Sequence, residues 1–145
     1  MRTFAPLAVL LSALAACSSD DSPPTGLKPE FTVHCVPPRL SVAANPAAIT
    51  RARNTNGSGK FVVTNGCDVS IGGWTASATR TGAVASVGTP NPVNIPTLAP
   101  GASFSPVLVP FTTGSSAGTG TVVLTVANDP GTVSRSGSLT VTVSP

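Results

Sequence analysis

The sequence has few of the side chains that carry out chemistry in proteins. Its 145 residues include no tyrosine, one tryptophan, one histidine and five acidic residues. A Ser-His-Asp arrangement would have to use His34, the only histidine, with one of Asp20, Asp21, Asp68 or Asp129. A glycosidase needs two facing carboxyl groups, whereas Asp68 and Asp129 both stand in turn sequences, where a carboxylate commonly caps the backbone. We therefore predict that the protein is not an enzyme.

Signatures of nucleic-acid, metal and cofactor binding are missing as well. The eight basic residues are scattered along the chain, whereas nucleic-acid binding needs them gathered in a stripe, so we expect no nucleic-acid partner. The sequence has no CxxC pair, no DxDxDG loop and no phosphate-binding or dinucleotide-binding glycine motif. We expect neither a metal nor a cofactor, and calcium at a single turn is the alternative.

The first sixteen residues have the layout of an export signal. Arg2 supplies a positive charge, and residues 4–16 form a mostly apolar run, which is shorter than the ~20 residues that cross a bilayer. The run ends in Leu14-Ala15-Ala16-Cys17, which resembles the lipobox of bacterial lipoproteins. The resemblance implies removal of residues 1–16 and attachment of acyl chains such as palmitate to Cys17. An ordinary secretory signal cut after Ala13-Leu14-Ala15 is the alternative.

The same resemblance implies a place in the bacterial cell envelope. Two or three acyl chains contribute ~0.8 kcal/mol per buried CH₂, so covalent lipid on Cys17 would hold the protein on a membrane. Ser18 stands where an aspartate favours retention in the inner membrane of enteric bacteria, so we expect the outer membrane. Residues 17–30 are polar, contain proline and have no apolar periodicity, and we expect them to form a flexible tether.

Residues 31–145 alternate between apolar and polar side chains with a period of two, which predicts an all-β domain. Short runs separated by turn-forming residues predict a single immunoglobulin-like β-sandwich of seven or eight strands. The expected inward-facing sets are Phe31, Val33 and Cys35; Leu40, Val42 and Ala44; Phe61 and Val63; Val69 and Ile71; Val122, Leu124 and Val126; and Leu139, Val141 and Val143.

Turn-forming residues set the expected connections. We predict a hairpin loop over residues 54–59, a tight turn at Asn65-Gly66, and a turn over residues 128–131 between the last two strands. Pro106 and Pro110 predict that their segment is an edge strand or contains a bulge.

Two glycines precede the only tryptophan. Gly72-Gly73 predicts a β-bulge that restores Trp74 to the core face. A sugar-stacking role for Trp74 is the alternative, although carbohydrate platforms usually need several exposed aromatic rings.

Cys35 and Cys67 remain as a pair once Cys17 carries lipid. Both fall on the inward parity of their segments, and exported proteins fold in an oxidising compartment, so we predict a disulfide. A metal pair or a reactive thiol lacks a partner, because His34 points to the strand face opposite to Cys35.

Three basic residues stand close together in the sequence. Arg51 and Arg53 alternate on one predicted strand face, with Lys60 opposite. They are candidates to contact anionic lipid headgroups or lipopolysaccharide phosphates. A solvated strand face or protection of a sheet edge is the alternative.

Several segments resemble the ASPM–SPD-2–Hydin type of bacterial Ig-like repeat. Residues 98–104 match its L-x-P-G turn before an F strand, residues 118–130 match its G-x-L-x-V-x-S-N-D-P strand, and residues 61–66 match its F-x-v-t-N-x-G strand. The cysteine pair departs from that family. Antibody-type domains do not fit either, because Trp74 follows Cys67 by only seven residues and no later cysteine exists.

The resemblance implies a fold and a role in scaffolding or adhesion, and it transfers no catalytic or binding residue. We therefore predict a lipid-anchored, non-enzymatic interaction, adhesion or scaffolding module whose partner is an unknown envelope or extracellular protein. An envelope protein that binds glycan or lipid is the alternative.

Overall fold

The computed structural model describes residues 35, 38–129 and 131–145. This part of the chain contains strands and no helix. The strands are β1 (Leu40–Ala44), β2 (Ala48–Ala52), β3 (Asn56–Asn65), β4 (Trp74–Gly82), β5 (Val84–Val87), β6 (Asn94–Ile95), β7 (Ser103–Thr113), β8 (Gly118–Asn128) and β9 (Ser134–Ser144).

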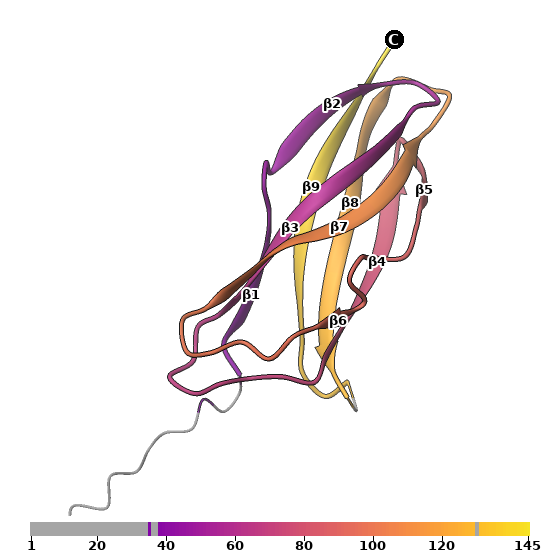
Figure 1. The fold of residues 1–145 in the computed structure, drawn as a ribbon. Coiled ribbons are helices and arrows are strands. Elements are labelled where there is room, and N and C mark those ends of the chain that lie inside the picture. The colour runs from indigo at the N-terminus through magenta and orange to yellow at the C-terminus, as the bar shows by residue number, and fades with distance from the viewer. Residues whose placement is uncertain (1–34, 36–37, 130) are drawn as a thin grey trace, which may run out of the picture. The chain divides into compact units, whose positions relative to one another are not determined.

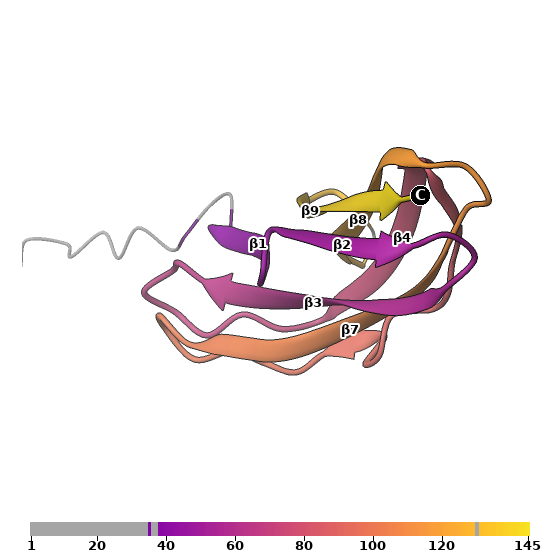
Figure 2. The ribbon, with the colours of Figure 1, turned by 90° about the horizontal axis from the view of Figure 1, so that it is seen from above.

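The strands form two sheets that face each other (Figures 1 and 2). One sheet has the order β1-β3-β7-β5 and the other the order β2-β9-β8-β4-β6. All pairings are antiparallel except that of β2 with β9. The first order corresponds to the A-B-E-D sheet of an immunoglobulin domain, and β9-β8-β4 corresponds to its G-F-C sheet. The predicted all-β sandwich is confirmed, with nine strands in place of seven or eight.

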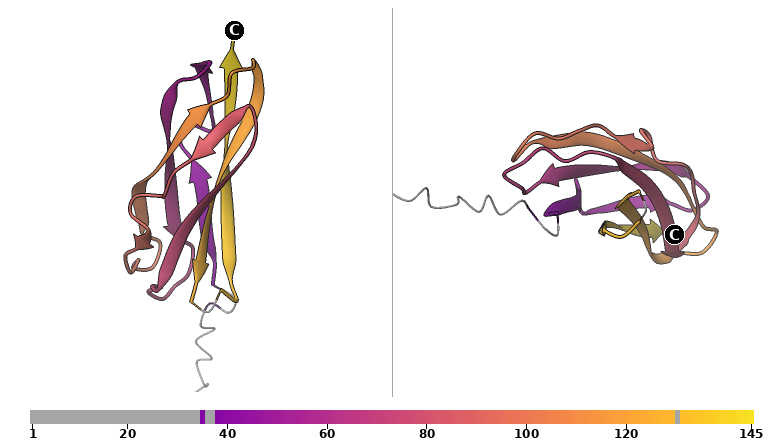
Figure 3. Two further views of the ribbon diagram at one scale, coloured as in Figure 1. Left: turned by 90° about the vertical axis from the view of Figure 1, so that its right-hand side faces the viewer. Right: turned by 90° about the horizontal axis from the view of Figure 1, so that it is seen from below.

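Alternating side chains from both sheets fill the space between them, which is the two-layer architecture visible from the side in Figure 3. The predicted inward sets on β3, β8 and β9 are confirmed, and Trp74 is buried at 3% exposure. The largest fully buried apolar side chains are those of Phe61, Leu124, Leu139, Val63, Val84, Val107, Val109, Val122, Val126, Val141 and Val143.

The predicted hairpin loop over residues 54–59 is wrong. Only residues 53–55 connect β2 to β3, and the two strands belong to different sheets. Gly57 and Gly59 lie inside β3, where a Cβ atom on Gly57 would come 2.6 Å from Phe111 Cζ and one on Gly59 would come 2.8 Å from Leu139 Cδ2. These glycines therefore make room for core side chains and do not serve a turn.

The edge position predicted for the Pro106 and Pro110 segment is also wrong. β7 lies between β3 and β5. The predicted bulge is present, because Phe61 faces Val107 and Val63 faces Phe104, so β7 advances by one more residue than β3. Pro110 is accommodated just beyond the end of β5, where its carbonyl accepts a hydrogen bond from the Gly88 N–H at 2.8 Å.

Two further predicted connections differ in detail from the structure. The chain does not turn back at Asn65-Gly66, since the Gly66 N–H still donates to the Arg39 carbonyl at 2.6 Å. Ile71 forms only an isolated bridge with Leu98, and a new strand begins at Trp74, so Gly72-Gly73 separates two segments and is not a bulge within one strand.

The turn between β8 and β9 is confirmed. Asn128 closes it by donating its N–H to the Val133 carbonyl at 3.0 Å and accepting the Val133 N–H on Oδ1 at 2.8 Å. The predicted strand at residues 31–35 lies outside the described residues, apart from Cys35, which is not in a strand.

Candidate functional site

The described residues do not gather acidic, histidine or cysteine side chains into a reactive cluster. Asp68 lies in the loop after β3, Asp129 lies in the turn after β8, and no group of three such side chains is placed to share a metal ion within this part of the chain. His34 and Cys17 lie outside the described residues. The described residues also contain no helix of the length and hydrophobicity needed to span a membrane.

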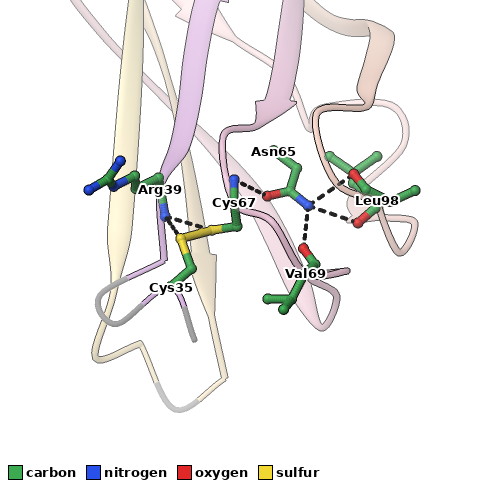
Figure 4. Close-up of a disulfide and its surroundings, with 7 residues drawn as sticks. Cys35, Arg39, Asn65, Cys67, Val69 and Leu98 are labelled. Carbon is green, nitrogen blue, oxygen red and sulfur yellow. Dashed lines mark hydrogen bonds between the residues drawn. A yellow bond between two sulfur atoms is a disulfide. The ribbon is translucent and has the colours of Figure 1, made fainter. Parts of the chain in front are cut away.

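Cys35 and Cys67, the predicted pair, are joined by a disulfide (Figure 4). The bridge links the segment before β1 to the loop after β3. The last pair of the β1–β3 ladder is Leu40 with Asn65, and Cys67 lies two residues beyond Asn65. The Arg39 N–H points at both sulfur atoms, at 3.3 Å from Cys35 Sγ and 3.1 Å from Cys67 Sγ. The disulfide therefore extends the attachment of β1 to β3 beyond its hydrogen bonds.

Asn65 organises the loops next to the disulfide, although its sequence context predicted only a turn residue. Its side chain is fully buried, and Nδ2 donates to the carbonyl oxygens of Val69 at 2.8 Å, Leu98 at 3.0 Å and Ala99 at 3.0 Å (Figure 4). Oδ1 accepts the Cys67 N–H at 2.8 Å. Asn65 thus joins two segments that resemble the Ig-like repeat, residues 61–66 and 98–104. Its inward parity after Phe61 and Val63 was the available signal.

A groove of about 460 Å³ lies between β2 and β3. It exists because the chain leaves one sheet at the end of β1 and enters the other at β2. As a result β1 pairs only with residues 61–65 of β3 and leaves residues 56–59 without a neighbouring strand on that side. The lining residues are Asn45, Pro46, Ile49, Arg51, Ser58, Gly59, Lys60 and Leu139.

Backbone groups of β3 face this groove. The Asn45 N–H donates to the Lys60 carbonyl at 2.9 Å, which places the Lys60 backbone on the β1 side of β3. Since N–H and C=O groups alternate in direction along a strand, the Ser58 N–H and C=O point to the same side. The open half of β3 therefore presents hydrogen-bonding groups along the groove.

β2 forms the opposite wall and is itself an edge strand. The Ala47 carbonyl accepts the Thr140 N–H at 2.9 Å, and the Arg51 carbonyl accepts Ser144 Oγ at 3.3 Å, so both face β9. By alternation, the backbone groups of Ala48 and Thr50 point away from β9.

The structure brings two of the three predicted basic residues together. Arg51 and Lys60 both line the groove and are exposed, although they belong to different sheets. Arg53 lies in the turn after β2 and is not among the lining residues. The groove also has an apolar floor, to which Ile49 and the buried Leu139 contribute.

Trp74 does not form a sugar platform. Its ring is packed in the core, and its Nε1 atom is buried with no hydrogen-bond partner in the structure. The prediction that Trp74 faces the core is therefore confirmed.

Comparisons with known proteins add only distant likenesses. No family model and no curated protein matches the chain. Similar solved structures include the CARDB domain of the PF1109 protein from Pyrococcus furiosus (15% identity, 74% of this chain, 89% of that chain, TM-score 0.46). They also include PapD-like domain 7, an ASH domain, of human CEP192 (11% identity, 72% of this chain, 84% of that chain, TM-score 0.44). No family is shown.

The secreted serine protease VesC from Vibrio cholerae is also similar, with 15% identity and a TM-score of 0.47. The match covers 68% of this chain and 22% of the protease. Because all three TM-scores are below 0.5, the immunoglobulin-like fold of this chain is assigned from its strand order alone.

Proposed function

We propose that this chain is a lipid-anchored protein of the bacterial cell envelope whose Ig-like domain binds another protein and catalyses no reaction. The observation that carries this proposal is the β2–β3 groove, where open strand edges, an apolar floor and two exposed cations lie together. Binding through an open strand edge is a common way for β-sandwich domains to recognise partners. The described residues offer no acid–base pair that would suggest a reaction.

Two features support an envelope location. The disulfide between Cys35 and Cys67 suits an oxidising compartment, because cytosolic thiols are kept reduced. Leu14-Ala15-Ala16-Cys17 at the end of a short apolar run supports export with lipid on Cys17. The lipid, the outer membrane and the adhesion or scaffolding role belong to this proposal.

The glycan-binding alternative has lost its main support, because Trp74, the only tryptophan, is 3% exposed. The lipid-binding alternative keeps the pair of cations in the groove. It does not use the open strand edge, so we favour a protein partner.

Replacing Cys17 with serine tests the anchor. We expect the Cys17→Ser chain to incorporate no radioactive palmitate and to remain as unprocessed precursor, because serine offers no thiol for lipid attachment. The Ser18→Ala chain is the matched control and should be labelled like the native protein. Palmitate incorporation into the Cys17→Ser chain would contradict the anchor.

Cross-linking in intact cells tests the protein partner. A photo-reactive amino acid at Ser58, in the groove, should form an adduct with one defined envelope protein. The same amino acid at Ser138, an exposed residue of β9 outside the groove, should form none. Adducts of equal yield at both positions, or none at Ser58, would contradict binding through the groove.

A further inference from the structure

The groove also indicates what kind of protein segment it binds. Building on the function proposed above, we infer that an extended acidic segment of the partner adds as a short strand beside residues 56–60 of β3. It would occupy the position next to β3 that β1 leaves at Asn45.

The backbone supplies the first argument. β1 and the added strand would lie one after the other along the same edge of β3, because β1 stops pairing at Phe61. The Ser58 N–H and C=O and the Lys60 N–H would then hydrogen bond to the segment as they would to a native neighbour. Residues 56–59 and the Lys60 N–H are open, so the segment would run along residues 56–60, a length of about 17 Å at ~3.3 Å per residue.

Charge supplies the second argument. Arg51 and Lys60 line the groove, whereas none of its lining residues is acidic. The acidic side chains that the structure describes, Asp68 and Asp129, belong to loops at the end of the sandwich opposite to the β2–β3 turn (Figure 1). Neither cation takes part in a salt bridge within the described residues, so both are available to carboxylates of a partner.

A second copy of the domain does not complement this groove. None of the nine described strands contains an acidic residue, so no strand of another copy would place a carboxylate between Arg51 and Lys60. An anionic headgroup would satisfy the cations and leave the open edge of β3 unused. An acidic peptide satisfies both features.

The probe is a peptide selected from a random nine-residue display library on the full chain, purified from membranes in detergent. We expect the enriched peptides to carry net negative charge and alternating β-branched residues. A synthetic enriched peptide should slow hydrogen exchange at the Ser58 and Lys60 amides, which lie on the open edge of β3.

Two sets of variants test the cations and the edge. Arg51→Glu with Lys60→Glu should weaken binding of the peptide by at least about tenfold. Arg39→Glu with Arg135→Glu changes net charge equally outside the groove and should leave affinity within about twofold. Ser58→Pro removes the edge N–H without touching the β7 side, and it should abolish the protection that the peptide gives to the Lys60 amide. Should Ser58→Pro fail to fold, the charge variants and the exchange pattern still decide.

Four outcomes would overturn the inference. They are enrichment of peptides without acidic residues, equal losses in both charge-variant pairs, displacement of the peptide by inorganic phosphate or short-chain phosphatidylglycerol, and protection of Ser58 in the chain before any peptide is added. The last outcome would mean that residues 18–30, which include Asp20, Asp21 and Glu30, already occupy the groove. None of these affects palmitate labelling, and a partner cross-linked elsewhere on the domain would leave the proposed interaction role standing.

Discussion

A chain in which Cys35 and Cys67 are both alanine is expected to lose about 4 kcal/mol of unfolding free energy relative to the native chain. The disulfide spans a sequence separation of 32 residues, and closing a loop of that length removes about this much conformational free energy from the unfolded ensemble. Small domains are stable by only about 5–15 kcal/mol, so the variant should accumulate poorly in the envelope. Urea unfolding followed by Trp74 fluorescence measures the difference.

The control for this experiment changes two exposed side chains instead. Ser41→Ala with Ser58→Ala lies on the same two strands, β1 and β3, and should shift stability by less than about 1 kcal/mol. If the reductant-treated native protein unfolds at the same urea concentration as the oxidised protein, the bridge contributes no stability and the expectation is wrong.

The Asn65→Asp chain is expected to lose about 3 kcal/mol or more. Aspartate has nearly the same shape and keeps the acceptor for the Cys67 N–H, but it removes the donor that serves the carbonyl oxygens of Val69, Leu98 and Ala99. A fully buried carboxylate facing three carbonyl oxygens is strongly disfavoured. The midpoint of urea unfolding measures this loss.

The Asn56→Asp chain is the matched control for that substitution. Asn56 lies on the same strand and is exposed, and its Oδ1 accepts the Thr112 hydroxyl at 2.8 Å, a bond that aspartate retains. Its stability should stay within about 0.5 kcal/mol of the native value. Equal effects of the two substitutions would show that the buried network contributes little.

The strands were largely predictable because the pattern that specifies them is local. Leu139, Val141 and Val143 alternate with polar residues, and a half-buried strand must show that period. The core position of Trp74 was predicted from a bulge at Gly72-Gly73 that would bring the opposite parity inward. The position is confirmed, but these glycines are instead a break between two segments.

Glycine and proline misled where their role depends on distant neighbours. Gly57 and Gly59 have the appearance of a turn, yet they are glycine because Phe111 and Leu139 occupy the space that a Cβ atom would need. Pro110 suggests an edge strand, but β7 is internal and the proline lies just past the end of β5. The two glycines depend on residues 54 and 80 positions away, and Pro110 depends on a strand that ends 23 positions before it.

The candidate site was predictable in part. Arg51 and Lys60 stand out in a chain with few charges, but the sequence could not show that they line one groove while Arg53 does not. Their meeting depends on the chain changing sheets between Ala44 and Ala48, which opens half of the β3 edge.

The sequence by itself determined the all-β class and most inward-facing positions, because alternation is a property of neighbouring residues. It also determined the cysteine pair, because two cysteines remain beside Cys17 and both fall on inward positions. Only the tertiary structure decided which strands pair, that Asn65 joins three loop carbonyls and that β3 has an open half beside Arg51 and Lys60. The physical reason is that sheet pairing is set by side chains packing across the sandwich. A groove formed by two sheets therefore cannot be predicted from any single stretch of the sequence.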